Sequence, residues 1–69
     1  MRDKFEMFIE LLIGGERVNI NPYEYGDFLR YVEGSEYESL FEKHMSREFK
    51  MISEDEGVVT VWLNHPTPA

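Results

Sequence analysis

The feature that most constrains the fold is an alternating pattern in residues 4–21, KFEMFIELLIGGERVNIN. Every odd-numbered position from 5 to 13 is apolar, which is the period of two expected of a strand with one face on a core. Gly14 and Gly15 can both adopt the positive φ of a two-residue hairpin turn, and residues 17–20 continue as a short second strand. The pattern therefore predicts a β-hairpin in which the apolar sides of both strands coincide.

The length of 69 residues predicts a single small domain, which we expect to occupy residues 1–65, with residues 66–69 as an extended C-terminal tail. A chain of this size buries only about 60% of the surface that its unfolded form exposes. Because the sequence contains no cysteine, stability must come from good packing or from an oligomer interface. No apolar run approaches the roughly 20 residues of a membrane span, and no signal peptide is visible. We expect a cytoplasmic protein without contact to membranes.

Two short helices are predicted in the middle of the chain. Asn21 can cap a helix, a proline follows it, and apolar residues then recur at i, i+3, i+4 and i+7, so the first helix is expected over residues 22–33. Gly34 is expected to end this helix in the left-handed conformation. A second capping signature at residues 35–38 predicts another helix over about residues 36–45. One kinked helix is the alternative.

A second hairpin is predicted at the C-terminal end. Residues 47–52 and residues 58–63, which are rich in β-branched side chains, read as strands, and a three-residue loop at 55–57 pairs Met51 with Val61. The predicted fold class is therefore α+β, with the order β-β-α-α-β-β. It consists of a four-stranded antiparallel sheet of order 2-1-4-3, with both helices on one face. The relative direction of the two central strands stays open.

The predicted sheet has an apolar surface on the side away from the helices. Patches of this kind, rimmed with charge, often mark interaction sites, and Trp62 and Phe8 are residue types that dominate binding hot spots. Self-association is the first function that we expect of this surface. The alternative is a solvated sheet in which the stem of Lys50 covers the Trp62 ring. The residues predicted to bind a partner on this face are Phe8, Leu12, Ile52 and Trp62.

The sequence is strongly acidic, with 14 Asp and Glu against 7 Lys and Arg and a net charge of -7. Such a charge disfavours direct binding to nucleic acid and favours a partner with a basic surface. Glu38 and Glu42 form a like-charge i,i+4 pair, which costs local stability and suggests selection for another purpose. One interpretation is a carboxylate array that mimics nucleic acid, and the other is an acidic face that maintains solubility. The acidic residues predicted to bind a partner are Glu24, Asp27, Glu38 and Glu42.

Motifs for catalysis are weak. His44 lies four residues before Glu48, a spacing compatible with a metal ligand or a general base, but no further ligands or nucleophile accompany it. A histidine at the edge of a core near a helix terminus is the alternative interpretation. His65 is a weaker candidate still. Gly14 and Gly15 lack the spacing of a phosphate-binding loop. We therefore expect no catalytic, cofactor-binding or metal-binding residues.

These observations favour a non-enzymatic protein-binding module, a small acidic inhibitor or modulator of a larger protein. Nucleic-acid-binding proteins are one class of partner that fits. In its general type, a short, acidic, cysteine-free α+β chain, the sequence is similar to small inhibitors made by phages and mobile elements. This resemblance carries no individual residues. The alternative is a structural or regulatory homodimer that associates through the apolar sheet face.

Overall fold

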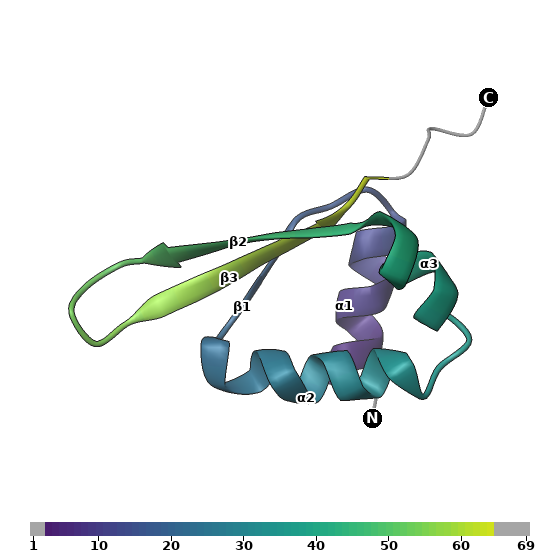
Figure 1. The fold of residues 1–69 in the computed structure, drawn as a ribbon, viewed down its shortest axis with the longest axis horizontal. Helices are drawn as coiled ribbons and strands as arrows, with labels where there is room; N and C mark the ends of the chain where they lie inside the picture. Colours follow the sequence, from purple (N-terminus) through teal and green to yellow (C-terminus); the bar gives the residue numbers. More distant parts are fainter. Residues whose placement is uncertain (1–2, 65–69) are drawn as a thin grey trace.

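The computed structural model describes residues 3–64, and it contains three helices and three strands. Along the chain these are α1 (Lys4–Ile13), β1 (Val18–Ile20), α2 (Pro22–Glu33), α3 (Glu38–His44), β2 (Met45–Met51) and β3 (Gly57–Leu63). The strands form one antiparallel sheet of order β1-β3-β2, and the β2–β3 hairpin extends past the helices (Figure 1). The prediction of an α+β protein is confirmed, but the predicted four-stranded sheet with two helices is wrong.

The segment predicted as the first strand is the helix α1. Its buried side is formed by Phe5, Phe8, Ile9 and Leu12, which lie at i, i+3, i+4 and i+7. Asp3 caps the helix by accepting a hydrogen bond from the Phe5 backbone N–H at 2.9 Å. Because Met7, Leu11 and Ile13 are apolar as well, every odd position from 5 to 13 is apolar, and the segment fits a period of two as well as one of 3.6. Its ten residues are long for a strand and ordinary for a helix.

The glycine pair ends α1 instead of forming a hairpin turn. Gly15 has a φ of 93°, its N–H donates to the Leu12 carbonyl at 3.0 Å, and the Glu16 N–H donates to the Leu11 carbonyl at 3.0 Å. These two bonds define a Schellman motif, which satisfies carbonyl groups that the end of a helix leaves open. Strand β1 therefore does not return along α1, and it pairs with β3 instead.

The two predicted helices in the middle of the chain are present as separate helices. The Asn21 side chain accepts a hydrogen bond from the Tyr23 N–H at 2.8 Å, and α2 has the predicted bounds. Gly34 follows its last residue but has a φ of -89°, so the predicted left-handed conformation is wrong. The Ser35 hydroxyl accepts from the Tyr37 N–H at 3.2 Å and thus caps the turn that precedes α3. The helix itself begins only at Glu38.

The C-terminal hairpin exists, but its predicted register is wrong. Met51 pairs with Gly57 instead of Val61, which leaves a loop of five residues. In the predicted register, the start of β2 lies opposite a segment that contains Pro66, and proline has no N–H to donate to a sheet. The observed register lets β2 pair along its whole length, directly from the end of α3.

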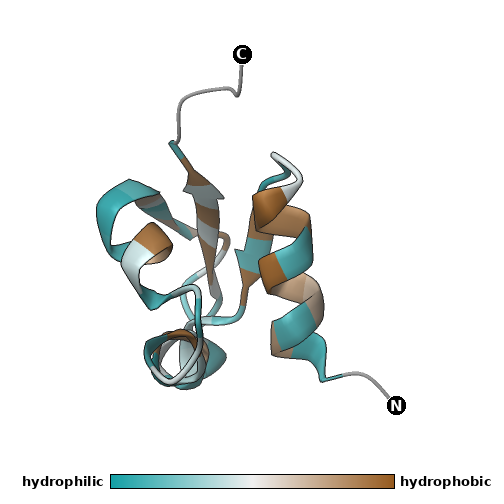
Figure 2. Cartoon of the chain, turned by 90° about the vertical axis from the view of Figure 1, so that its right-hand side faces the viewer, coloured by the Kyte–Doolittle hydropathy of each residue, from teal (hydrophilic) through white to brown (hydrophobic). Residues whose placement is uncertain are grey.

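The core lies between the sheet and the helices. The Phe28 ring is fully buried, and its centroid lies 5.9 Å from those of Phe5 and Phe8 and 6.3 Å from that of Phe41. Figure 2 shows α1 and α3 on either side of the strands, with α2 seen along its axis below them. This aromatic cluster joins all three helices. Burial of one such side chain is worth about 1.5–3 kcal/mol, so the helices contribute much of the stability of a small sheet.

Among residues 3–64, no helix is long and apolar enough to cross a membrane. The predicted tail at residues 66–69 and His65 lie outside the described residues.

Candidate functional site

The structure does not bring the four predicted sheet-face residues together. Phe8 and Leu12 belong to α1, where Phe8 packs against the core and Leu12 is 0% exposed. Ile52 lies in the β2–β3 loop and is 65% exposed, whereas Trp62 lies on β3. The expected surface depended on α1 being a strand of the sheet, so it is not formed.

Trp62 is partly covered by Arg17, and not by Lys50 as in the alternative of a solvated sheet. The Arg17 guanidinium lies over its ring at 4.1 Å from the centroid, and its indole N–H donates to the Asn64 side-chain oxygen at 3.0 Å. Trp62 pairs across the sheet with Ser46, whereas Lys50 pairs with Val58. These contacts leave Trp62 as a half-buried, hydrogen-bonded residue of the outer sheet face.

The predicted acidic residues fall into two groups. Glu24 forms an ion pair with Lys4 of α1, and Asp27 forms one with Arg30 one turn further along α2. Their charges are therefore balanced locally by exposed pairs, which are individually worth little. Glu38 and Glu42 lie on α3, and they line the same groove as a third carboxylate at the end of α2.

The ends of α2 and α3 enclose a small groove, which we call the α2–α3 groove. Its volume is about 130 Å³. Glu33 from α2 and Glu38 and Glu42 from α3 supply its carboxylates. The remaining lining residues are apolar and come from α2, α3 and the start of β2: Leu29, Val32, Phe41 and Met45.

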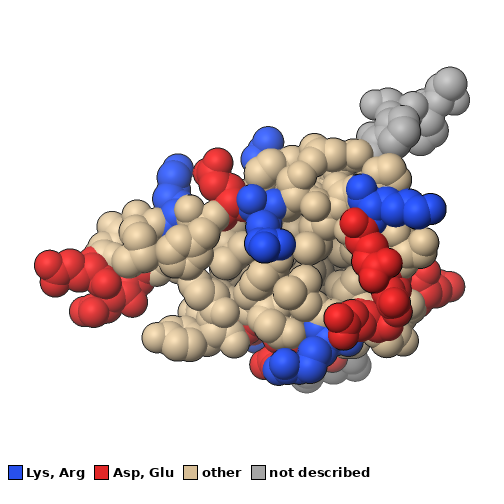
Figure 3. All heavy atoms as spheres, viewed as in Figure 1, with Lys and Arg blue, Asp and Glu red and all other residues tan. Residues whose placement is uncertain are grey.

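The charge of this groove is not compensated within the part of the chain that the structure describes. Glu33, Glu38 and Glu42 form no ion pair with any of residues 3–64, in contrast to Glu24 and Asp27. In Figure 3, acidic side chains gather over α3 and again at the end of the hairpin loop, and several Lys and Arg side chains lie on the surface between them. The groove thus combines an apolar floor with three carboxylates in its lining.

Sequence reasoning found Glu38 and Glu42 but did not connect them with Glu33. The sequence did contain a signal for this groove. On each helix, the lining residues next to the connecting turn are spaced at i, i+3 and i+4. On α2 the set ends in Glu33, and on α3 it begins with Glu38. What the sequence did not show is the angle between the helices, which decides whether the two sets face each other.

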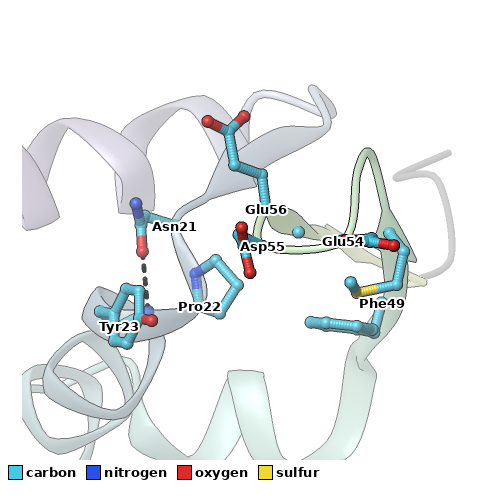
Figure 4. A pocket seen from close by; sticks show the side chains of 9 residues that line it. Asn21, Pro22, Tyr23, Phe49, Glu54, Asp55 and Glu56 are labelled. Atoms are coloured by element: carbon cyan, nitrogen blue, oxygen red, sulfur yellow. Dashed lines mark hydrogen bonds between the residues drawn. The ribbon is translucent and has the colours of Figure 1, made fainter.

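A second hollow lies between the start of α2 and the tip of the hairpin. Figure 4 shows Pro22 and Tyr23 on one side and Phe49 on the other, with the acidic loop residues beside them. This hairpin cleft is larger than the α2–α3 groove, with a volume of about 500 Å³. Sequence reasoning missed it because the predicted register placed the loop and its strands differently.

His44 occupies the last position of α3, and its Nδ1 lies 3.1 Å from the Asn64 backbone oxygen. Glu48 belongs to β2, so the helical i,i+4 spacing between these two residues is not formed. Within residues 3–64, no three His, Asp or Glu side chains are placed to hold a metal ion together. The position of His44 fits the alternative interpretation of a histidine at a helix terminus beside the core.

The geometry defines a small α+β protein with an acid-rimmed apolar groove between two helices and a long hairpin at one end. Comparison of the chain with protein-family models, with curated proteins and with solved structures found no match.

Proposed function

We propose that the protein is a non-enzymatic binding module that recognises a basic segment of a larger protein through the α2–α3 groove. The observation that carries this proposal is a set of three carboxylates that line one apolar hollow and form no ion pair with any of residues 3–64. An exposed acidic face alone serves solubility, but solubility does not require the charges to surround an apolar floor.

The groove suits one long cationic side chain of the partner. Lysine and arginine place an apolar stem along apolar surface while the charged head reaches polar groups. In the groove, the partly exposed Leu29 and Met45 offer apolar surface for such a stem, and Glu38 and Glu42 offer charge-assisted hydrogen bonds to its head. The net charge of -7 adds long-range attraction, which raises the association rate with a basic partner.

The partner is expected to be a protein with a basic surface, and nucleic-acid-binding proteins are one class that presents such a surface. In that case the module acts as an inhibitor or modulator that occupies the surface in place of nucleic acid. We place this activity in the cytoplasm, a location that agrees with a sequence without cysteine.

The test is a pull-down from host lysate with three forms of the tagged protein: wild type, E38K/E42K and E54K/E56K. Both variants change the net charge by the same amount, but only the first alters the α2–α3 groove. We expect wild type and E54K/E56K to retain the same basic partner and E38K/E42K to lose it. A challenge with double-stranded DNA then shows whether the partner's nucleic-acid site is the surface bound.

Equal retention by all three forms would contradict the proposal. Equal loss from both variants would also contradict it, because binding would then follow total charge instead of the groove. A neutral variant, L29Q, separates the two contributions, since it changes the apolar floor and leaves every charge in place. We expect L29Q to weaken binding to the same partner.

A further inference from the structure

The long outer edge of β2 is open in the part of the chain that the structure describes, because the strand order is β1-β3-β2. The Asn64 N–H donates to the His44 carbonyl at 2.6 Å, and the Ile52 N–H donates to the Glu56 carbonyl at 2.8 Å. In an antiparallel pair, hydrogen-bonded residues alternate, so the even-numbered residues between these two bonds face β3. The odd-numbered residues of β2 therefore direct their backbone N–H and carbonyl groups to the open edge.

This edge has the properties of a pairing template. Its ladder with β3 runs without a bulge through all seven residues, and β2 contains no proline. Phe49 and Met51 are 59% and 56% exposed, which is unusual for large apolar side chains of a sheet. Long, regular edge strands with exposed apolar residues associate with other strands unless charges prevent it.

Among the registers centred on residues 47–50, the charges of β2 favour one for pairing with a second copy. In a two-fold antiparallel pair, the central residue lies opposite its own copy. A pair centred on Arg47, Glu48 or Lys50 places that charge against an identical charge. A pair centred on Phe49 instead places Glu48 opposite the partner's Lys50, and Lys50 opposite the partner's Glu48. Opposite charges across strands stabilise a sheet, and like charges destabilise it.

We propose that the protein forms a two-fold homodimer in which β2 pairs antiparallel with the partner's β2, centred on Phe49. The two sheets join into one sheet of six strands. Figure 1 shows the hairpin extending past the helices, and antiparallel pairing places the helices of the two copies at opposite ends of the joined hairpins. This interface differs from the sheet face considered from the sequence, and it does not depend on the α2–α3 groove having a partner.

The first experiment measures the monomer–dimer equilibrium by sedimentation for wild type, E48K, K50E and E48K/K50E. Each single variant makes both cross-strand pairs between residue 48 of one copy and residue 50 of the other repulsive. We therefore expect the dimer dissociation constant to rise by about tenfold or more. The double variant exchanges the charges at residues 48 and 50, which restores both opposite-charge pairs. We therefore expect nearly wild-type association. Within the monomer these two residues lie opposite Thr60 and Val58, so the substitutions create no like-charge pair there.

The second experiment tests the register with single cysteines, because the chain contains none of its own. Residue 49 lies opposite its own copy at a Cα separation of about 5.5 Å, which a disulfide can bridge. In the same register, residue 51 of one copy and residue 51 of the other are four residue positions apart, which is about 13 Å along the strand. We therefore expect F49C to form a crosslinked dimer on mild oxidation and M51C to remain largely monomeric.

The proposal would be overturned by a wild-type protein that is monomeric at millimolar concentration, by a double variant that dimerises no better than the single ones, or by M51C that crosslinks as readily as F49C. The variant E38K carries the same charge change as E48K but lies in the α2–α3 groove, and we expect it to dimerise normally. Loss of dimerisation in E38K would show an effect of net charge and would also overturn the proposal.

Discussion

Replacing Leu12 and Leu11 separately by alanine distinguishes the helix α1 from the strand that the alternating pattern predicts. In the helix, Leu12 is 0% exposed and belongs to the core, whereas Leu11 is 43% exposed. In the predicted strand, Leu11 would face the core and Leu12 would lie on the other face. The two structures therefore predict opposite orders of stability for L12A and L11A.

The expected loss for L12A is about 2–5 kcal/mol, the range for a leucine whose removal leaves a cavity in a packed core. A chain of this length has a free energy of unfolding of about 3–10 kcal/mol, so L12A removes a large part of it. For L11A we expect a loss below about 1 kcal/mol, because the side chain is already half exposed and alanine favours a helix.

Urea denaturation followed by Trp62 fluorescence and far-ultraviolet circular dichroism measures both values. The measurement is made at two protein concentrations, since dimerisation makes apparent stability depend on concentration. In thermal denaturation, L12A is expected to lower Tm by at least about 8 °C, at about 4–8 °C per kcal/mol for a small domain. A loss for L11A equal to or larger than that for L12A would refute the assignment of α1 as a helix with this buried side.

Two further substitutions test local features of the helices. Gly26 lies inside α2 with no atom within 4 Å of a Cβ built on it, so we expect G26A to stabilise the protein by about 0.5–1 kcal/mol in urea denaturation. G15A is its control, because the φ of 93° at Gly15 strains alanine, and a gain there would contradict the described end of α1. N21A removes the cap of α2 and is expected to cost about 1 kcal/mol, whereas N21D keeps an acceptor and should cost little; equal losses for both would argue against the cap.

The helix α2 was predictable from the sequence because its signals are local. Asn21 and the proline after it mark the start, and the apolar spacing has a single period. The strand β3 was predictable for a similar reason, since its β-branched residues favour a strand. When the predicted first strand is removed from the order 2-1-4-3, the order of the remaining strands equals the observed β1-β3-β2.

The N-terminal segment was not predictable from periodicity, since its apolar residues fit both a strand and a helix. The Gly14–Gly15 pair fits both a hairpin turn and the end of a helix, so neither signal excluded the other. The length of the segment and the cap at Asp3 point to the helix, whereas the alternation of apolar residues points to the strand. The two errors were linked, because reading Gly14 and Gly15 as a turn required strands on both sides.

The candidate site also combines features that local sequence determines with features that depend on the tertiary structure. The sequence by itself determined the acidic charge, the absence of cysteine, the helix α2 and the carboxylates of α3, because these depend on composition and on neighbours within one or two turns. Only the tertiary structure decided that α1 packs as a helix, that Met51 pairs with Gly57, and that Glu33 shares a groove with Glu38 and Glu42. These features depend on which surfaces bury one another, and burial is a property of the whole chain that no local pattern contains.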